Sequence, residues 1–392
     1  MMKRTWVLLS TLILVGLLAA TTASADMPVR KIVVFRENTA PAAKQTAVRD
    51  VGGKQLKSLR MANAVAAELT SASAAALAVR PDVLRVIDDG IAQEHTIDAP
   101  DAPKLADRQA EQKPNNGSET VPWGISRIHA PEAWEYAGGT GVKVAVLDSG
   151  IDLSHPDLRV AGGVNEVDGA RGYDDDRGHG THVAGVIAAL SNKQGVVGVG
   201  PAIELYAVKV LDKKGRGWWS DIFAGLDWCV DNGIQVANLS FGSAQYDQTY
   251  EEVIYRTHKA GVVLVASAGN NGPTPDSVHY PARYPGVIAV AAIDSSDRLP
   301  SWSSTGPQVD LAAPGVDILS TYTGPHYTTL SGTSMAAPHV TGAAALSLAV
   351  DPKRSPNQVE DLLKATATTL AGLSTDQQGA GLVDALKAVN GR

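Results

Sequence analysis

The sequence predicts an α/β fold in which helices cover both faces of a mainly parallel sheet. From about residue 119 onward, short runs rich in Val, Ile and Ala alternate with longer helical segments, a pattern typical of strands joined by helical crossovers. The strands are apolar along their whole length, which indicates that both faces of the sheet are buried. We expect strands at residues 143–147, 204–211, 235–239, 262–267 and 287–292, and helices at 180–190, 220–232, 249–260, 333–349, 356–365 and 382–389.

A smaller α+β unit is predicted ahead of this sheet, within residues 26–98. We expect strands at residues 31–35, 54–59, 64–69 and 83–87, and helices at 42–51 and 71–79. The resulting order is β-α-β-β-α-β, the ferredoxin-like arrangement. This arrangement serves many functions and indicates none by itself.

The N-terminal segment has the pattern of an export signal. Lys3 and Arg4 precede an apolar run at residues 6–20, and small residues at 23–25 supply a cleavage pattern, so we predict a signal peptide at 1–25. A membrane anchor is the alternative, but the run is short for a span and no stop-transfer charges follow it. Residues 99–118 are rich in Pro, Asp, Gln, Lys and Asn, which predicts a flexible linker before the main domain at 119–392.

The charge and the cysteine count limit the possible partners and compartments. The net charge is +3 over residues 1–118 and −10 over residues 119–392. An acidic main domain argues against nucleic acid as a partner. The single cysteine, Cys229, excludes an intramolecular disulfide, and its apolar helical setting predicts a buried, inert thiol. An exported chain without disulfides needs another source of stability, and bound calcium is one candidate.

Four polar residues follow predicted strands or begin predicted helices. Asp148 and Asn270 follow strands, whereas His179 and Ser334 lie in the first turns of helices. Because ligands of such sheets bind beyond the carboxyl ends of the strands, we expect these side chains to meet in one crevice. They supply an orienting carboxylate, a general base, an oxyanion donor and a nucleophile.

Each of these residues has a structural interpretation when taken alone. Aspartate, asparagine and serine are common turn and cap residues. His182 follows His179 by one turn, but no third ligand is offered for a metal, so we interpret His182 as a packed, hydrogen-bonded side chain. The acidic run at residues 174–176 is interpreted as solvated. An α/β-hydrolase is disfavoured because Ser334 lacks the Gly-x-Ser-x-Gly motif and follows the Asp and His in the chain.

With these motifs the chain resembles the subtilisin-type serine proteases, or subtilases, over nearly its whole length. The blocks that carry the resemblance are Asp148-Ser-Gly, His179-Gly-Thr-His-Val-Ala-Gly and Gly332-Thr-Ser-Met-Ala-Ala-Pro. The resemblance implies a three-layer α/β/α catalytic domain preceded by a pro-domain that inhibits the protease and assists its folding. It implies a secreted, monomeric endopeptidase that processes itself. The pro-domain would be cut near residues 95–98, and the linker could be trimmed as far as residue 118.

The resemblance also implies a role for each catalytic residue. Asp148 holds the imidazole of His179 in the required tautomer. His179 takes the hydroxyl proton of Ser334, which forms the acyl-enzyme, and returns that proton to the leaving amine. The side chain of Asn270 and the backbone N–H of Ser334 bind the oxyanion.

Substrate binding in this family implies that an extended peptide pairs with two segments of the enzyme. Here the matching residues are Ser240, Phe241 and Gly242 in one segment and Gly215, Arg216 and Gly217 in the other. Trp219 would border an outer apolar subsite, with core packing at a helix start as the alternative. His279 lies where the family commonly has a small residue at the base of the primary specificity pocket. We therefore expect a preference for medium apolar residues over the largest aromatic ones.

The resemblance further implies a calcium site built from oxygen ligands. The matching residues are Glu119, Asp157, Asn192 and Gln194 through their side chains, and Leu190 and Val196 through their carbonyl groups. Such a donor set suits Ca²⁺ better than a softer metal. The alternative is that residues 192–195 form only a helix-ending turn.

Two other classes of protein are compatible with parts of the sequence. A catalytically silent binding or inhibitor protein on the same fold is disfavoured because all four catalytic groups are present. A carboxylic-acid-type relative working at low pH would have acids in place of His179 and Asn270, and the sequence has neither.

Overall fold

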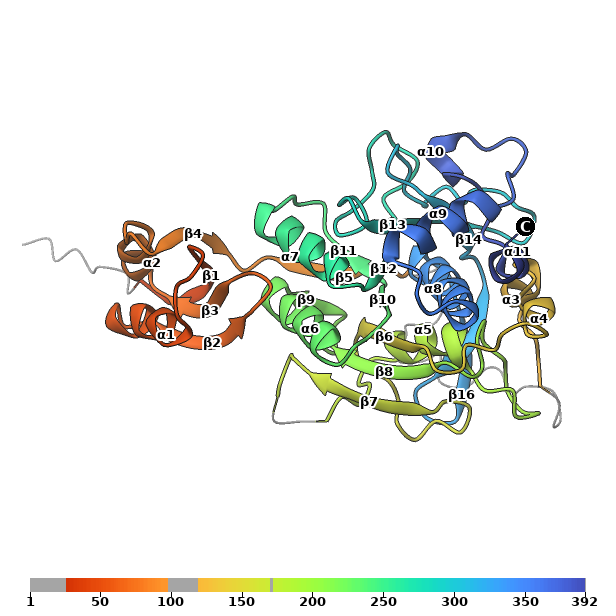
Figure 1. Ribbon diagram of the computed structural model, residues 1–392, viewed down its shortest axis with the longest axis horizontal. Helices are drawn as coiled ribbons and strands as arrows, with labels where there is room; N and C mark the ends of the chain where they lie inside the picture. Colours follow the sequence, from red (N-terminus) through yellow and green to blue (C-terminus); the bar gives the residue numbers. More distant parts are fainter. Residues whose placement is uncertain (1–25, 98–118, 170–171, 392) are drawn as a thin grey trace, which may run out of the picture.

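The computed structural model describes residues 26–97, 119–169 and 172–391 (Figure 1). The predicted signal peptide and linker lie outside these residues. Within the described part of the chain, no helix combines the length and the apolar character needed to cross a membrane.

The first unit is a four-stranded antiparallel sheet with two helices. Its elements follow in the order β1 (Val29–Phe35), α1 (Pro41–Asp50), β2 (Lys54–Leu59), β3 (Ala64–Leu69), α2 (Ser71–Ala78) and β4 (Val83–Asp88). The strand order in the sheet is β2-β3-β1-β4, and all three pairings are antiparallel. The predicted ferredoxin-like arrangement is therefore confirmed.

The main unit is built on a seven-stranded parallel sheet in the order β14-β13-β12-β10-β6-β8-β7. The strands are β6 (Lys143–Asp148), β7 (Val160–Asn165), β8 (Glu204–Lys209), β10 (Val236–Leu239), β12 (Val263–Ser267), β13 (Val287–Ile293) and β14 (Leu311–Pro314). All five predicted strands are present. The two edge strands, β7 and β14, were not predicted.

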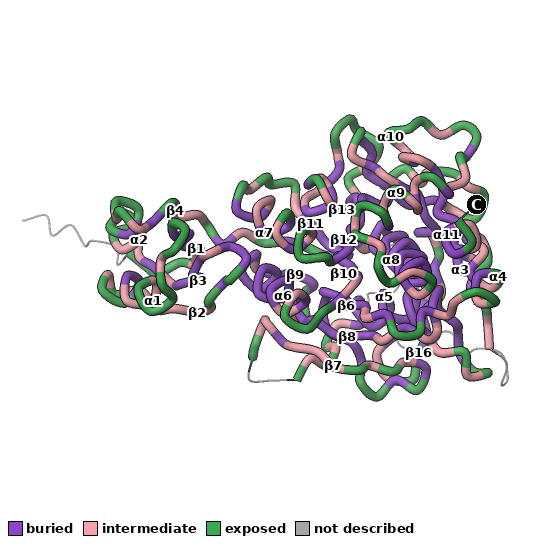
Figure 2. Tube along the Cα trace, viewed as in Figure 1, coloured by how far each residue is buried: buried purple, intermediate pink, exposed green. Residues whose placement is uncertain are grey.

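Helices cover both faces of this sheet, which confirms the three-layer fold. Successive residues of each strand point to opposite faces of the sheet. In β6, Val144 and Val146 pack in one hydrophobic cluster with α5 (His179–Ala188) and α8 (Thr333–Val350). The alternate residues Ala145 and Leu147 pack in a second cluster with α6 (Trp219–Asp231) and α7 (Gln248–Lys259). Helix α8 is buried along nearly its whole length (Figure 2).

The remaining elements are short or peripheral. They are β5 (Ile91–Glu94), α3 (Trp123–Arg127), α4 (Ala130–Ala133), β9 (Arg216–Trp218), β11 (Phe241–Gly242), β15 (Ile318–Tyr322), β16 (His326–Leu330), α9 (Pro356–Thr366), α10 (Thr375–Gln378) and α11 (Ala385–Asn390).

The small unit docks against helices α6 and α7. The carboxylate of Asp89 accepts hydrogen bonds from the backbone N–H of Ser220 at 2.9 Å and from its hydroxyl at 2.7 Å. Asp89 therefore caps the N-terminus of α6, where a negative charge is stabilising. In return, Asp227 of α6 accepts hydrogen bonds from the backbone N–H groups of Arg60 and Met61. The two units share one hydrophobic cluster, so their contact is partly apolar.

Candidate active site

Asp148 and His179 form a buried hydrogen-bonded pair. Asp148 is the last residue of β6 and His179 the first of α5. The ring nitrogen Nδ1 of His179 lies 2.7 Å and 2.9 Å from the two carboxylate oxygens of Asp148. A proton on Nδ1 leaves the other ring nitrogen, Nε2, free to accept one. Nε2 is buried and has no hydrogen-bond partner among the described residues.

Close packing at the start of α5 fixes this pair. A side-chain carbon on Gly180 would lie 2.1 Å from the carbonyl oxygen of Gly150 and 3.1 Å from Cβ of Asp148, so only glycine allows the helix to approach the strand end. The carboxylate of Asp175 accepts hydrogen bonds from the backbone N–H groups of Gly178 and Thr181. Asp175, which the sequence analysis interpreted as solvated, therefore caps the helix that carries His179.

The ionisation of His179 depends on its charged neighbours. Burial by itself would lower the pKa of His179, but the negative charges of Asp148 and Glu94 outweigh it and raise the pKa to about 9. A carboxylate oxygen of Glu94 lies 4.0 Å from Nδ1 of His179. In this bound arrangement the imidazole therefore keeps its proton at neutral pH.

Ser334 lies in the first turn of α8, as predicted, since the helix begins at Thr333. Its hydroxyl donates to the carbonyl oxygen of Ser240 at 2.8 Å and accepts from the backbone N–H of His95 at 3.0 Å. No hydrogen bond joins Ser334 to His179 here, so the expected proton-transfer contact is not made in this conformation.

The two predicted oxyanion donors, the backbone N–H of Ser334 and the side-chain amide of Asn270, both lie at the start of α8. The backbone N–H of Ser334 donates to the carbonyl oxygen of His95 at 3.3 Å. The side-chain oxygen of Asn270 accepts from the N–H and the hydroxyl of Thr333 at 3.0 Å and 2.9 Å. These bonds fix the orientation of the amide, whose nitrogen Nδ2 is buried without a hydrogen-bond partner among the described residues. A buried donor without a partner calls for an explanation, and a bound oxyanion is the one that the family resemblance implies.

Strand β5 of the same chain lies between β9 and β11, as an extended peptide substrate would (Figure 1). It pairs antiparallel with β9 on one side and with β11 on the other. The register joins Ala92 to Gly217 and Gln93 to Gly242. Both predicted segments thus lie beside an extended peptide, as in strand-addition binding.

The peptide bond between His95 and Thr96 is held on both sides of Ser334. Before it, the N–H of Glu94 donates to the carbonyl oxygen of Gly215 at 3.0 Å. After it, the N–H of Ile97 donates to the carbonyl oxygen of Ser331 at 2.9 Å. The structure thus presents one bond of this chain to the candidate nucleophile.

The two aromatic residues predicted for substrate contact both lie beside β5. A side-chain carbon on Gly90 would lie 2.4 Å from the indole of Trp219. Trp219 is itself buried at the start of α6, as the packing interpretation predicts. Its role as the border of an outer apolar subsite stays a prediction. The ring nitrogen Nδ1 of His279 lies 3.0 Å from Nε2 of His95. His279 thus contacts the side chain that precedes the presented bond.

The residues predicted for calcium also come together. The carboxylate of Asp157 is buried and accepts hydrogen bonds from Nδ2 of Asn192 and from the N–H of Val196, both at 2.9 Å. Burial raises the pKa of Asp157 to about 6, and within the described residues it has no cationic side chain as a partner. A buried carboxylate that has neutral hydrogen-bond partners and oxygen atoms around it is a suitable ligand for a hard cation.

The other predicted ligands lie in the same loop and make direct contacts. The carboxylate of Glu119 accepts hydrogen bonds from the N–H groups of Asn192 and Lys193, at 2.7 Å and 2.9 Å. The N–H of Leu190 donates to the carbonyl oxygen of Asp157, and the N–H of Gln194 donates to the side-chain oxygen of Asn192. The side chain of Gln194 is exposed.

Two residues with a structural interpretation behave as predicted. Nε2 of His182 lies 2.9 Å from the carbonyl oxygen of Ile318, and burial lowers the pKa of this histidine to about 3. His182 is thus a packed, neutral side chain. Cys229 is buried and unpaired.

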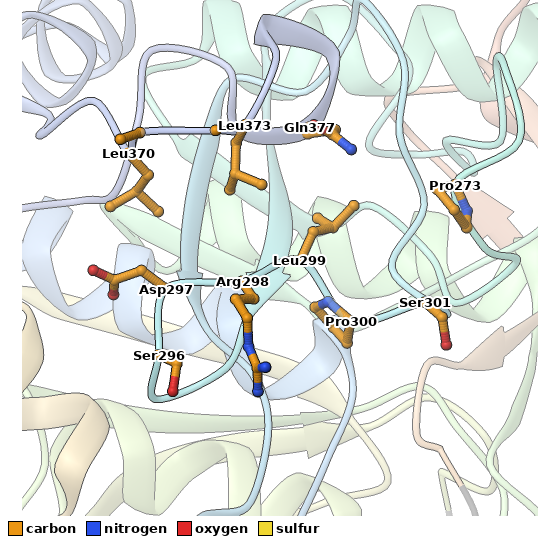
Figure 3. A pocket seen from close by; sticks show the side chains of 12 residues that line it. Pro273, Ser296, Asp297, Arg298, Leu299, Pro300, Ser301, Leu370, Leu373 and Gln377 are labelled. Atoms are coloured by element: carbon orange, nitrogen blue, oxygen red, sulfur yellow. The ribbon is translucent and has the colours of Figure 1, made fainter.

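A surface hollow of about 640 Å³ lies away from these groups (Figure 3). Ser296 and Arg298 are on one side of it and Leu370 and Leu373 on another (Figure 3). None of the candidate catalytic residues lines it, so it is separate from the site described here.

Sequence reasoning missed the residues that contact β5 through their side chains. These contacts join Glu94, the last residue of β5, to Arg177 and the adjacent His95 to Ser267. The role of Asp175 at the start of α5 was missed as well. Arg177 lies two residues before His179, and Ser267 lies three residues before Asn270. Their proximity to the catalytic motifs could have indicated a role in the site. Their partners could not be identified, because they are distant in the sequence.

Comparison with known proteins identifies the family. The subtilase family profile (peptidase S8) matches residues 139–381. Subtilisin BL of Lederbergia lenta is 50% identical over 269 residues, which cover 68% of this chain and 98% of that protein. The thermostable alkaline protease of Halalkalibacterium halodurans is 48% identical over 272 residues, with 69% and 74% covered. Subtilisin amylosacchariticus of Bacillus subtilis subsp. amylosacchariticus is 41% identical over 397 residues, with 97% and 98% covered. The chain therefore belongs to the subtilase family and is a serine endopeptidase.

Proposed function

We propose that this chain is a secreted endopeptidase, made as a zymogen that cleaves itself between His95 and Thr96 and acts through an acyl-enzyme on Ser334. The observation that carries the proposal is that strand β5 lies between β9 and β11 and brings this bond to Ser334. Residues 1–25 are proposed as the signal peptide, 26–98 as the pro-domain, 99–118 as the linker and 119–392 as the catalytic domain.

In the acylation step, the hydroxyl of Ser334 turns from the Ser240 carbonyl toward Nε2 of His179. Its oxygen attacks the carbonyl carbon of His95 while Nε2 takes the hydroxyl proton. The backbone N–H of Ser334 and Nδ2 of Asn270 stabilise the oxyanion. The bond to Thr96 then breaks, and His179 donates its proton to the new amine.

In the deacylation step, a water molecule attacks the acyl carbon. His179 takes a proton from this water and then returns it to Ser334 as the ester bond breaks. Asp148 keeps the tautomer of His179 constant and stabilises the charged imidazole. The products are a carboxylate on His95 and an amine on Thr96.

The docked pro-domain explains how the zymogen is kept inactive. Its strand β5 pairs with β9 and β11, the strands with which a substrate would have to pair. Asp89 and Asp227 bind the rest of the pro-domain to α6. We propose that the enzyme acts as a monomer. After cleavage the fragment ending at His95 remains an inhibitor until it dissociates or is degraded.

The loop at residues 190–196 is proposed to bind Ca²⁺ with Glu119 and Asp157. The support for this proposal is the buried carboxylate of Asp157, which has Asn192 beside it and the carboxylate of Glu119 hydrogen-bonded to the same loop. When bound, the ion would neutralise Asp157 and tie the start of the catalytic domain to this loop.

Chelation of calcium is expected to lower the melting temperature of the mature enzyme by about 10 °C, because a ligand at 1,000 times its Kd contributes about 4 kcal/mol. Differential scanning calorimetry with and without EDTA measures this shift. Asp157→Asn should lower the melting temperature and remove its calcium dependence. The exposed Asp361→Asn serves as the matched control and should keep it. An EDTA-insensitive melting temperature would contradict the calcium proposal.

Self-cleavage of the chain without residues 1–25 tests the proposed function. In calcium buffer we expect two fragments on a gel and, with time, hydrolysis of casein. The rate should rise with pH through about 9, because His179 must lose its proton to act as a base and its pKa is raised to about 9. This direction agrees with relatives that are named alkaline proteases. A folded chain that stays whole across this pH range would favour the silent binding protein instead.

A further inference from the structure

The side chain of His95 fills a buried pocket and uses both of its ring nitrogens. His95 is 5% exposed. Its Nδ1 lies 2.7 Å from the hydroxyl of Ser267, and its Nε2 lies 3.0 Å from Nδ1 of His279. Counting backwards from the bond to Thr96, His95 occupies the first substrate position. The first-position pocket thus binds an imidazole by two hydrogen bonds.

The ring of His95 is packed closely by backbone and by a second imidazole. A side-chain carbon on Gly242 would lie 2.8 Å from Cε1 of His95 and 3.0 Å from Cβ of His279. The ring centroids of His95 and His279 are 5.0 Å apart, with the planes tilted by 60°. Backbone therefore forms one wall and the imidazole of His279 forms part of the other.

The two groups that bind the ring of His95, the Ser267 hydroxyl and Nδ1 of His279, have no alternative hydrogen-bond partner among the described residues. In the described part of the chain, the Ser267 hydroxyl and Nδ1 of His279 make no other hydrogen bond, and Ser267 is fully buried. Burial, together with His279 and His179, holds the pKa of His95 well below its usual value, so one ring nitrogen donates and the other accepts. A hydroxyl and an imidazole can supply both matching roles. An apolar side chain would leave both groups buried and unpaired.

The second substrate position, occupied by Glu94, has a charged partner. Arg177 donates from Nε and Nη2 to the two carboxylate oxygens of Glu94, at 2.8 Å and 2.5 Å. The side chain of Glu94 is only 4% exposed. The guanidinium is positioned by the N–H of Arg177, which donates to Asp175, and by its carbonyl, which accepts from Tyr322. A bidentate ion pair of this kind selects a carboxylate by geometry as well as by charge.

We propose that the cleft selects substrates with glutamate at the second position and histidine at the first, through Arg177 at one and Ser267 with His279 at the other. This inference rests on the proposed function and adds a substrate class to it. It differs from the medium apolar preference expected from the sequence, which considered the size of His279 and not its hydrogen bonds or those of Ser267. The pro-domain sequence at residues 92–95 is then the enzyme's own preferred substrate.

The test uses the mature enzyme and internally quenched peptides that carry the sequence of residues 92–97. One series has His, Phe, Leu or Ala at the first position, and another has Glu, Gln or Lys at the second. We expect kcat/KM for His to exceed that for Phe and Leu by about tenfold to hundredfold, because a site built for hydrogen bonds rejects analogues that lack them. Glu should exceed Gln by about tenfold and Lys by more.

Variants of the enzyme separate selection from general damage. Ser267→Ala should lower kcat/KM for the His peptide by about tenfold and raise that for the Phe peptide, because no buried hydroxyl is then left without a partner. Arg177→Gln should remove the preference for Glu over Gln at the second position. Ser296→Ala and Arg298→Gln, at the hollow of Figure 3, are matched controls that should leave both preferences intact.

The possible outcomes distinguish this inference from the proposed function. Cleavage of all the peptides with Phe or Leu equal to or faster than His would overturn the selection at the first position. Equal rates with Glu, Gln and Lys would overturn it at the second. If no peptide is cleaved by the folded enzyme, the proposed function fails and the inference fails with it.

Discussion

Replacing Ser334 with alanine is expected to reduce the rate of self-cleavage by on the order of 10⁶, which is a complete loss on a laboratory time scale. The variant keeps the pro-domain contacts and Asn270 but has no oxygen to attack His95. Electrophoresis of the chain without residues 1–25 measures the effect. The same samples, treated with an organofluorophosphonate, should show labelling of the parent enzyme and none of the variant.

A serine in the same helix provides the control for this prediction. Ser347 also lies in α8, and its hydroxyl bonds only to the carbonyl oxygen of Ala344 in the same helix. Ser347→Ala should therefore cleave itself as the parent does. Self-cleavage of Ser334→Ala at the parental rate would remove this residue from the mechanism.

Replacing Asn270 with alanine is expected to lower kcat by about 10²–10³, because one of the two oxyanion donors is lost. The substrate contacts on β9 and β11 do not involve Asn270, so KM should change little. Steady-state kinetics of the mature enzyme on a peptide substrate separates the two parameters. Asn270 also accepts two hydrogen bonds from Thr333, so thermal unfolding should accompany the kinetics.

The neighbouring asparagine is a matched control for this substitution. Asn271 is exposed and lies one residue further along the same loop. Asn271→Ala should retain parental kcat and KM. A kcat for Asn270→Ala equal to that of the parent would show that its amide does not stabilise the oxyanion.

The main sheet and the positions of the catalytic groups could be predicted from the sequence because their signals are local. Each central strand is a short apolar run, and Asp148 follows such a run directly. His179 and Ser334 were predicted in the first turns of helices, where the structure has them. The edge strands β7 and β14 were missed, because β7 has two glycines and only one buried residue, and β14 is a short run that ends in a proline.

The path of β5 through the cleft could not be predicted from local patterns. Strand β5 is four residues long, and its partners β9 and β11 lie more than 120 residues further along the chain. The ion pair of Glu94 with Arg177 and the contact of His95 with Ser267 could not be predicted from local patterns either. Such pairings depend on the docking of one folded unit on another, which no residue spacing encodes.

The orientation of the Ser334 hydroxyl could not be predicted from the sequence either. The family resemblance implies a hydrogen bond to His179, but the structure has the hydroxyl bonded to Ser240 and His95. A bound peptide decides between the two arrangements, and its position follows only from the tertiary structure.

The central claim is that this chain cuts its own bond between His95 and Thr96. The most direct measurement is the intact mass and N-terminal sequence of the fragments formed by the chain without residues 1–25, in calcium buffer at about pH 9. We predict one fragment that ends at His95 and one that begins with Thr96, before any later trimming of the linker. A first cut at any other bond, with the bond after His95 intact, would contradict the account.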